Sequence, residues 1–280
     1  MLNFVPSLIS LLSYGSASAA SKKAIGIIGR HKAIVYAYIV LVVLLAAGAV
    51  ILGEEFSFPL EILPFYIAQV SIGALGAIAA YKALDYGKAS IVSPIGKVYV
   101  LAVLATSIII LGEELTIGQI AGSVAIVGSA VVLAMDKAGK LKAEKWMLYL
   151  GFSVICRAYY FTFIKNFVLL FGAYQTAVLL EVGIAVFTIA FHALRGRDIS
   201  PPAAGKLRYP AAPGILVFIG SVFYNLSVSY IGAALTAAIS AGTPIVNSVA
   251  SYALLREKLD MHKYAAIVLM VVGLAMVFLF

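Results

Sequence analysis

Apolar runs follow one another along almost the whole chain, separated by short polar links. Each run approaches the roughly 20 residues that a helix needs to cross a hydrocarbon core about 30 Å thick. Only 11 % of the 280 residues are charged, whereas an average soluble domain has about 25 %. The sequence therefore predicts an all-α integral membrane protein, multi-pass in the cell membrane, with little left over for a soluble domain.

Ten transmembrane helices are predicted from apolar length and from the turn-forming residues between the runs. We expect these helices near residues 3–21, 33–53, 62–83, 88–111, 117–135, 146–167, 172–194, 213–231, 233–255 and 263–280.

Lys and Arg are concentrated in the links that follow the odd-numbered helices, as Lys22, Lys142 and Arg197 illustrate. In the other links Lys165 is the one basic residue, and the acids are Glu54, Glu55, Glu61, Glu113 and Glu114. Because Lys and Arg favour the cytoplasmic side of a membrane, we expect the first set of links in the cytoplasm. Both termini would then lie outside.

Several classes of function are disfavoured by the polar residues. The net charge of +8 sits in short links, not on one basic face with interleaved aromatic rings, so we expect no nucleic-acid partner. The single cysteine, Cys156, excludes an internal disulfide and a multi-thiol metal site. His31, His192 and His262 are far apart in the sequence, and no metal-binding motif of an intramembrane enzyme is present. We expect no enzyme activity, no cofactor and no resident metal.

The two halves of the chain resemble each other at an offset of 144 residues. The matching positions are Tyr86 with Tyr230, Ala89 with Ala233, Leu111 with Leu255, Glu113 with Glu257 and Leu115 with Leu259. We divide the chain into a first repeat at 1–145 and a second at 146–280. Five helices in each repeat require the second to lie upside down relative to the first, an architecture that many secondary transporters use.

Several short motifs give a resemblance to a known family over nearly the whole chain. They are Leu-Gly-Glu-Glu-Leu at 111–115, Leu-Arg-Glu-Lys-Leu at 255–259, Pro244 and the Gly-rich fifth and tenth helices. The chain resembles the ten-helix EamA-type branch of the drug/metabolite transporter superfamily. The resemblance implies carriage of small metabolites such as amino acids, nucleobases or choline, and more distant relatives carry nucleotide sugars and sugar phosphates. Glu113 and Glu257 resemble fold signatures that cap or tether a neighbouring helix.

Three ionisable residues fall deep inside predicted helices: Lys97, Arg157 and Glu181. Such residues are costly in a bilayer and are functional candidates by default. Arg157 and Glu181 lie at similar depths on consecutive antiparallel helices, so we expect them to reach ion-pair distance in at least one conformation. The alternatives are a purely structural salt bridge for that pair, and for Lys97 an ammonium that extends to the interface.

The other candidate residues are polar or helix-bending. Tyr14, Asn225 and Asn247 are expected to line a cavity with the three ionisable residues, because an unpaired amide is costly in hydrocarbon. Pro94 and Pro244 are candidate hinges, since each proline frees a backbone carbonyl and bends its helix.

These features predict a secondary active transporter that works by alternating access, as a monomer or homodimer. Two cations and one acid leave a positive surplus in the membrane, which favours an amino acid or a related carboxylate-bearing solute. Glu181 is the candidate for proton coupling, and exchange of two solutes is the other option. The alternatives are a sugar-phosphate, nucleotide-sugar or amine carrier, an intramembrane enzyme, and a membrane receptor or scaffold without transport.

Overall fold

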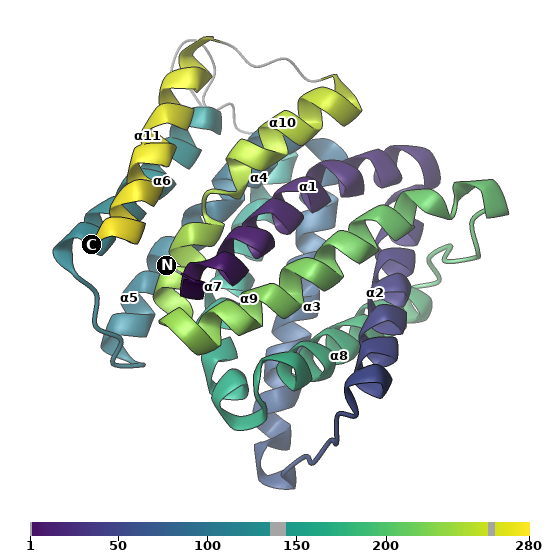
Figure 1. The fold of residues 1–280 in the computed structure, drawn as a ribbon. Helices are drawn as coiled ribbons and strands as arrows, with labels where there is room; N and C mark the ends of the chain where they lie inside the picture. The colour runs from purple at the N-terminus through teal and green to yellow at the C-terminus, as the bar shows by residue number, and fades with distance from the viewer. Residues whose placement is uncertain (1, 135–143, 257–260) are drawn as a thin grey trace.

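The computed structural model describes residues 2–134, 144–256 and 261–280. Within these ranges the chain is a bundle of helices without β-strands (Figure 1). The α-helices are α1 (Val5–Ile28), α2 (Arg30–Leu52), α3 (Leu63–Tyr86), α4 (Ala89–Ile95), α5 (Tyr99–Ile109), α6 (Ile117–Ala134), α7 (Lys145–Phe171), α8 (Ala173–Leu194), α9 (Arg208–Ser240), α10 (Thr243–Leu255) and α11 (Met261–Leu279). Short 3₁₀ helices accompany them: η1 (Leu2–Phe4), η2 (Leu60–Ile62), η3 (Gly96–Val98) and η4 (Ala204–Lys206).

Six stretches of the described chain are long and apolar enough to cross a membrane. They are Arg30–Leu52, Leu60–Tyr86, Ile91–Ile109, Lys145–Phe171, Ala173–Leu194 and Ala204–Ser240. Two shorter apolar helices, Ile117–Val132 and Ala265–Leu279, add to them. The serine-rich α1 and the 13-residue α10 fall outside both groups. The helices therefore fit a multi-pass membrane protein, but their length and composition alone do not establish ten spans.

Two of the ten predicted helices are broken near their middles. The segment predicted at 88–111 is divided into α4, η3 and α5, with Pro94 inside α4 just before the break. The segment predicted at 233–255 begins after a kink at Gly232, whose φ is 79°, and continues as helix 233–240, a turn and α10. Pro244 lies in the first turn of α10. Each candidate hinge proline thus lies beside a break. The missing backbone N–H costs little at Pro244, in a first turn, whereas Pro94 removes a hydrogen bond within α4 and favours the end of that helix.

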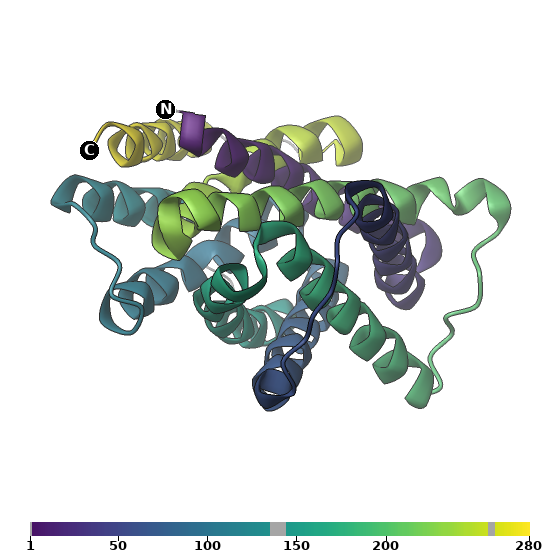
Figure 2. The ribbon, with the colours of Figure 1, turned by 60° about the horizontal axis from the view of Figure 1, so that its bottom comes forward.

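Helix starts and helix packing follow the 144-residue offset of the repeat. Tyr99 begins α5 and Thr243 begins α10, while Ile117 begins α6 and Met261 begins α11. α1 of the first half packs along α9 of the second half, and α7 of the second half packs along α3 of the first half in the equivalent way. The last helices of the two halves, α6 and α11, lie side by side at one edge of the bundle (Figures 1 and 2).

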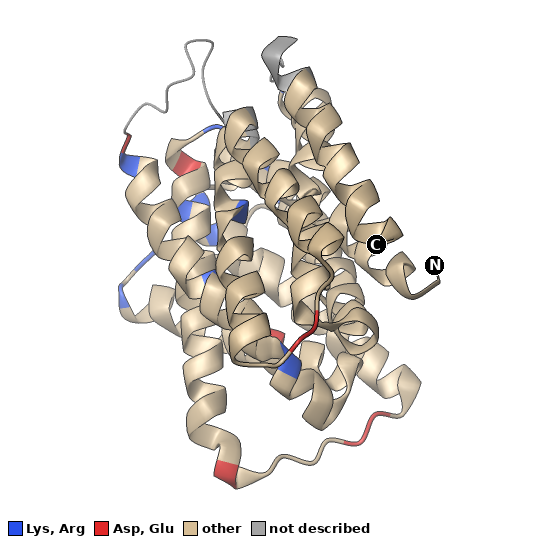
Figure 3. Cartoon of the chain, turned by 90° about the vertical axis from the view of Figure 1, so that its left-hand side faces the viewer, with Lys and Arg blue, Asp and Glu red and all other residues tan. Residues whose placement is uncertain are grey.

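α1 and its equivalent in the second half, α7, run in opposite directions. The end of α1, the end of α3 and the start of α7 meet in one apolar cluster that contains Ile25, Leu84 and Trp146. Most Lys and Arg residues lie toward this end of the bundle, which we call the basic side (Figure 3). The opposite end, where Glu54, Glu61 and Glu113 lie, is the acidic side.

Salt bridges tie the basic side together. Arg30 pairs with Asp85 at 2.6 Å and Lys32 with Asp198 at 2.9 Å. The hydroxyl of Ser200 and then the ammonium of Lys32 hold the pKa of Asp198 well below its usual range. Of the residues expected on one membrane face, Lys22 and Arg197 lie at this side, whereas Lys142 and also Glu257 lie outside the described residues.

Candidate functional site

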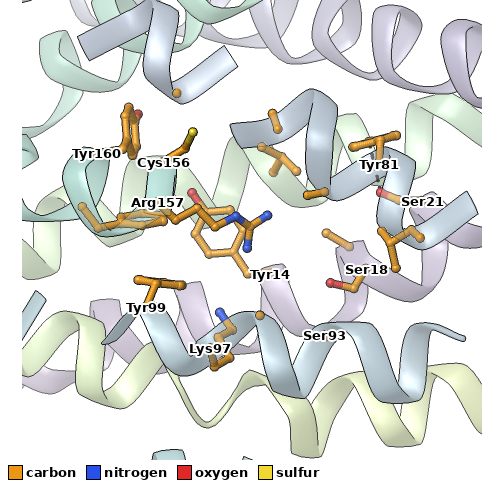
Figure 4. Close-up of a pocket in the computed structure, with 18 of the residues that line it drawn as sticks. Tyr14, Ser18, Ser21, Tyr81, Ser93, Lys97, Tyr99, Cys156, Arg157 and Tyr160 are labelled. Atoms are coloured by element: carbon orange, nitrogen blue, oxygen red, sulfur yellow. Dashed lines mark hydrogen bonds between the residues drawn. The ribbon is translucent and has the colours of Figure 1, made fainter. Parts of the chain in front are cut away.

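A cavity of about 180 Å³ lies between the helices and is lined by four of the residues expected there: Tyr14, Lys97, Arg157 and Glu181 (Figure 4). These side chains come from α1, η3, α7 and α8, so both halves of the chain contribute. The structure thus brings together candidates that are up to 167 residues apart in sequence. Their roles as substrate ligands remain a prediction.

Arg157 reaches from α7 into the middle of the cavity, toward Tyr14 (Figure 4). Its guanidinium makes no hydrogen bond or ion pair with any residue that the structure describes. A guanidinium carries five N–H donors and stays charged at any physiological pH. Arg157 is therefore a fixed, partly exposed cation with its donors available to a ligand.

Glu181 is buried in α8, with 6 % of its surface exposed. Its Oε1 accepts a hydrogen bond of 2.8 Å from Ser221 Oγ on α9. The ion pair with Arg157 is not formed in this conformation, in which the described salt bridges are Arg30–Asp85, Lys32–Asp198 and Lys165–Glu113. Both side chains nevertheless line the same cavity, so the pair stays a prediction for another conformation.

Lys97 is also buried, with 7 % of its surface exposed, and lies in η3 at the break between α4 and α5. Its Nζ donates to Ser240 Oγ at 3.4 Å and lies 5.8 Å from the centre of the Tyr99 ring. In this conformation the ammonium does not extend to the interface. Since Ser240 ends helix 233–240, the contact joins the two helix breaks across the cavity.

Tyrosine rings form much of the cavity wall. Besides Tyr14, the lining tyrosines are Tyr38, Tyr81, Tyr99 and Tyr160. The sequence reasoning did not select these four, although a tyrosine in the interior of an apolar helix needs a partner for its hydroxyl and is a detectable signal. Tyr14 itself is seated against Gly220, where an added Cβ would lie 2.9 Å from the ring.

The two asparagines expected in the cavity are buried elsewhere. Asn247 Nδ2 donates to the backbone oxygen of Ala89 at 2.9 Å, which joins α10 to the start of α4. Asn225 is 1 % exposed within α9. Neither residue is among the cavity lining. Asn247 therefore has a structural contact in this conformation.

The cavity extends toward the basic side of the bundle. Ser21, Leu84 and Leu150 belong to its lining and lie near the basic-side ends of α1, α3 and α7. Toward the acidic side the same helices are packed with aromatic rings: Phe65 stacks on Phe167 at 5.1 Å between ring centres, and Phe167 on Phe171 at 6.3 Å. The two ends of the bundle therefore differ in access to the cavity.

Residues that could hold a metal do not gather in the described part of the chain, where no group of three His, Cys, Asp or Glu side chains is present. His31 and His192, far apart in sequence, do meet at the basic side with ring centres 4.9 Å apart. Because the two histidines are far apart in the sequence, their contact could not be predicted from it. Arg30 lies 3.3 Å from His31 Nε2, and a guanidinium beside that nitrogen disfavours a metal there.

The sequence model of the EamA-like transporter family matches the chain twice, over residues 5–135 and 144–279. The chain belongs to the EamA-like transporter family. It is accordingly a multi-pass membrane protein and a transporter of the drug/metabolite type. Glu113 and the cavity residues described above are thus parts of an EamA-like transporter.

Two other similarities are more limited in what they show. An uncharacterized protein of Methanocaldococcus jannaschii is 31 % identical over 96 residues, which are 34 % of this chain and 66 % of that protein. A protein of known crystal structure has the same fold, with a TM-score of 0.78 over 98 % of each chain. At 16 % sequence identity, this second similarity shows the fold alone.

Proposed function

We propose that this EamA-like transporter is a secondary active carrier of a small carboxylate-bearing solute, an amino acid or a close relative, and that it works by alternating access. Ten membrane-crossing segments, two of them broken, would form two inverted five-helix repeats at 1–145 and 146–280. A single cavity between the repeats would open to the two sides in turn.

The repeat pattern supports the inverted arrangement. Helices that are 144 residues apart start at matching positions and make matching contacts, as α1 on α9 and α7 on α3 illustrate. The clustering of Ile25 with Trp146 places the end of α1 beside the start of α7, so these two equivalent helices are antiparallel. Inverted repeats around a central site are the common basis of alternating access.

Arg157 is the observation that carries the substrate class. A guanidinium that has no partner among the described residues, in a cavity of an otherwise apolar bundle, matches the geometry of a carboxylate, which it can bind through two parallel hydrogen bonds. Lys97 adds a second basic side chain to the same cavity. Glu181 provides the opposite charge from α8, so a solute with both a carboxylate and an ammonium finds a partner for each.

Glu181 is also the group best placed to carry a proton. It is the carboxyl among the lining residues, and its hydrogen bond to Ser221 leaves one oxygen for a ligand or a proton. Tyr14, Tyr38 and Tyr160 line the cavity with it, but an ordinary tyrosine stays protonated near neutral pH. We propose proton coupling at Glu181, with solute exchange as the alternative coupling.

Sugar-phosphate and amine carriage are the alternatives within transport. Arg157 and Lys97 would also suit a phosphate, whereas a purely cationic amine would leave both cations without a counter-charge. A receptor or scaffold would bind a solute in the cavity without moving it, and an enzyme would convert it.

A thermal-shift screen of the purified protein tests the substrate class. A ligand that binds the folded state raises its apparent melting temperature, so we expect stabilisation by one or more amino acids and not by simple amines. Ligands found in this way are then tested for uptake into vesicles. Stabilisation by amines or sugar phosphates alone would contradict the substrate class, and binding without uptake would favour the receptor.

A further inference from the structure

Glu113, in the link between α5 and α6, joins three parts of the acidic side. Its Oε1 accepts hydrogen bonds from Ala233 N at 2.8 Å and from Lys165 Nζ at 2.7 Å, and its Oε2 accepts one from Ala234 N at 2.8 Å. The Glu113 side chain is 8 % exposed and that of Lys165 is 21 % exposed. One carboxylate therefore holds the start of helix 233–240 and the acidic-side end of α7 together.

The backbone at Gly232 is shaped for this contact. Its φ of 79° lies in a region that glycine tolerates and other residues rarely adopt. An added Cβ there would lie 2.7 Å from Glu113 Oε1, so a larger residue would displace the carboxylate. A carboxylate at a helix N-terminus satisfies free N–H groups and is stabilised by the helix dipole.

Helix 233–240 connects this contact directly to the cavity. Eight residues span about 12 Å at 1.5 Å per residue. The first residues, Ala233 and Ala234, bind Glu113, and the last, Ser240, lines the cavity and accepts the hydrogen bond from Lys97. A displacement of one end of so short a helix moves the other end.

We infer that Glu113 and Lys165 form a latch that keeps the cavity closed toward the acidic side. Glu113 is the positioning residue that fixes helix 233–240, and Lys165 is the part that is released when α7 moves away. This inference rests on the proposed alternating access. It adds the residues that hold one of the two states.

Cys156 provides a natural probe for the test. It is the one cysteine of the chain and lines the cavity beside Arg157 (Figure 4). A membrane-impermeant, anionic methanethiosulfonate is applied to intact cells and to inside-out membrane vesicles. The ratio of the two labelling rates of Cys156 reports the side to which the cavity opens.

Lys165→Met removes the charged contact and keeps the cap of helix 233–240. We expect it to raise the ratio of acidic-side to basic-side labelling about tenfold, which corresponds to about 1.4 kcal/mol. Glu113→Gln should change the ratio in the same direction. Glu114→Gln is the matched control, because Glu114 is the exposed neighbour of Glu113, and it should leave the ratio unchanged.

The double exchange Glu113→Lys with Lys165→Glu separates pairing from capping. It restores an ion pair but places a cation at the N-terminus of helix 233–240, so we expect the ratio to stay raised. A wild-type ratio in this double variant would overturn the role of the cap. Unchanged ratios in Lys165→Met would overturn the latch, and this variant alone decides if the Glu113 variants do not fold.

The labelling ratio and solute flux separate the latch from the proposed function. The ratio is measured without any solute, so it tests the latch alone. Absence of uptake of every carboxylate-bearing solute, together with a tenfold change in the ratio, would remove the proposed substrate and leave the latch. Normal uptake of the solute, together with an unchanged labelling ratio in Lys165→Met, would remove the latch and leave the proposed substrate.

Discussion

Arg157 and Glu181 line the same cavity, but the protein holds them in different ways. The Glu181 carboxylate is buried and oriented by the Ser221 hydroxyl, whereas the Arg157 guanidinium has no partner among the described residues. A buried charge without a partner is costly, so Arg157 depends on the cavity remaining accessible to water or to a ligand. In the proposed function, Arg157 would therefore bind the solute, while the protein itself orients Glu181.

Removal of the guanidinium should have the largest effect on binding. We expect Arg157→Met to lower the affinity for a carboxylate-bearing ligand roughly 10- to 100-fold, the range for a charged hydrogen bond. The ligand-free protein should keep its melting temperature, because no described residue loses a hydrogen bond or an ion pair when the guanidinium is removed. Calorimetric titration and thermal unfolding measure the two quantities.

Cys156→Ser is the control for that substitution, since it changes the adjacent lining residue without altering charge. A large loss of stability in ligand-free Arg157→Met, with affinity retained, would mean that the guanidinium has a structural partner in solution. The conclusion that the protein orients Glu181 but leaves Arg157 without a partner would then be wrong.

Neutralising Glu181 should change the pH dependence of transport. A carboxyl can take up and release a proton, whereas the amide of Glu181→Gln cannot, so uptake into vesicles should lose its dependence on a proton gradient. The double variant Arg157→Met with Glu181→Gln should fold and not transport. Full activity with an unaltered pH profile in the double variant would reduce the two residues to a structural pair.

A smaller effect is expected from the wall between the charged groups. Gly220→Ala places a methyl group 2.9 Å from the Tyr14 ring, and overpacking of this kind costs about 1–3 kcal/mol. We expect a melting temperature below that of wild type and a ligand affinity lower by roughly tenfold at most. Gly151→Ala is the matched control, because an added Cβ there meets nothing within 4 Å. Equal behaviour of the two variants would show that Tyr14 is not held by Gly220.

The smallest change in binding is expected at Asn247. Asn247→Ala loses the hydrogen bond to Ala89 O, which should lower stability by about 1 kcal/mol, as for other polar contacts between membrane helices. Because Asn247 does not line the cavity in this conformation, the ligand affinity should stay within about twofold of wild type, well below the tenfold that 1.4 kcal/mol represents. A large loss of affinity would restore Asn247 to the substrate site.

The sequence was most informative where polar residues are costly. Lys97, Arg157 and Glu181 could be selected because a charge inside an apolar helix needs a reason, and all three line the cavity. The family was recognised from short motifs in both halves, and the family match confirms it. The contacts of Glu113 with Ala233 and Ala234, by contrast, could not be predicted from the sequence, since these residues are 120 or more positions away along the chain.

Other features depended on packing that the sequence does not encode locally. Asn225 and Asn247 were expected in the cavity because an amide is costly in hydrocarbon, yet such a group can equally bind a backbone carbonyl between helices, as Asn247 does. The meeting of Lys97 with Ser240 requires both helices to break at equivalent positions. The prolines predicted the positions of the breaks, but neither segment alone predicts that Lys97 contacts Ser240 across the cavity.

Counterflow into vesicles tests the central claim most directly. Purified protein is reconstituted with a high internal concentration of an unlabelled amino acid that stabilises it, and uptake of the labelled amino acid is followed over time. We expect labelled solute to accumulate transiently with the wild-type protein and not with Arg157→Met. Equal accumulation with both proteins would contradict the binding of the substrate carboxylate by Arg157.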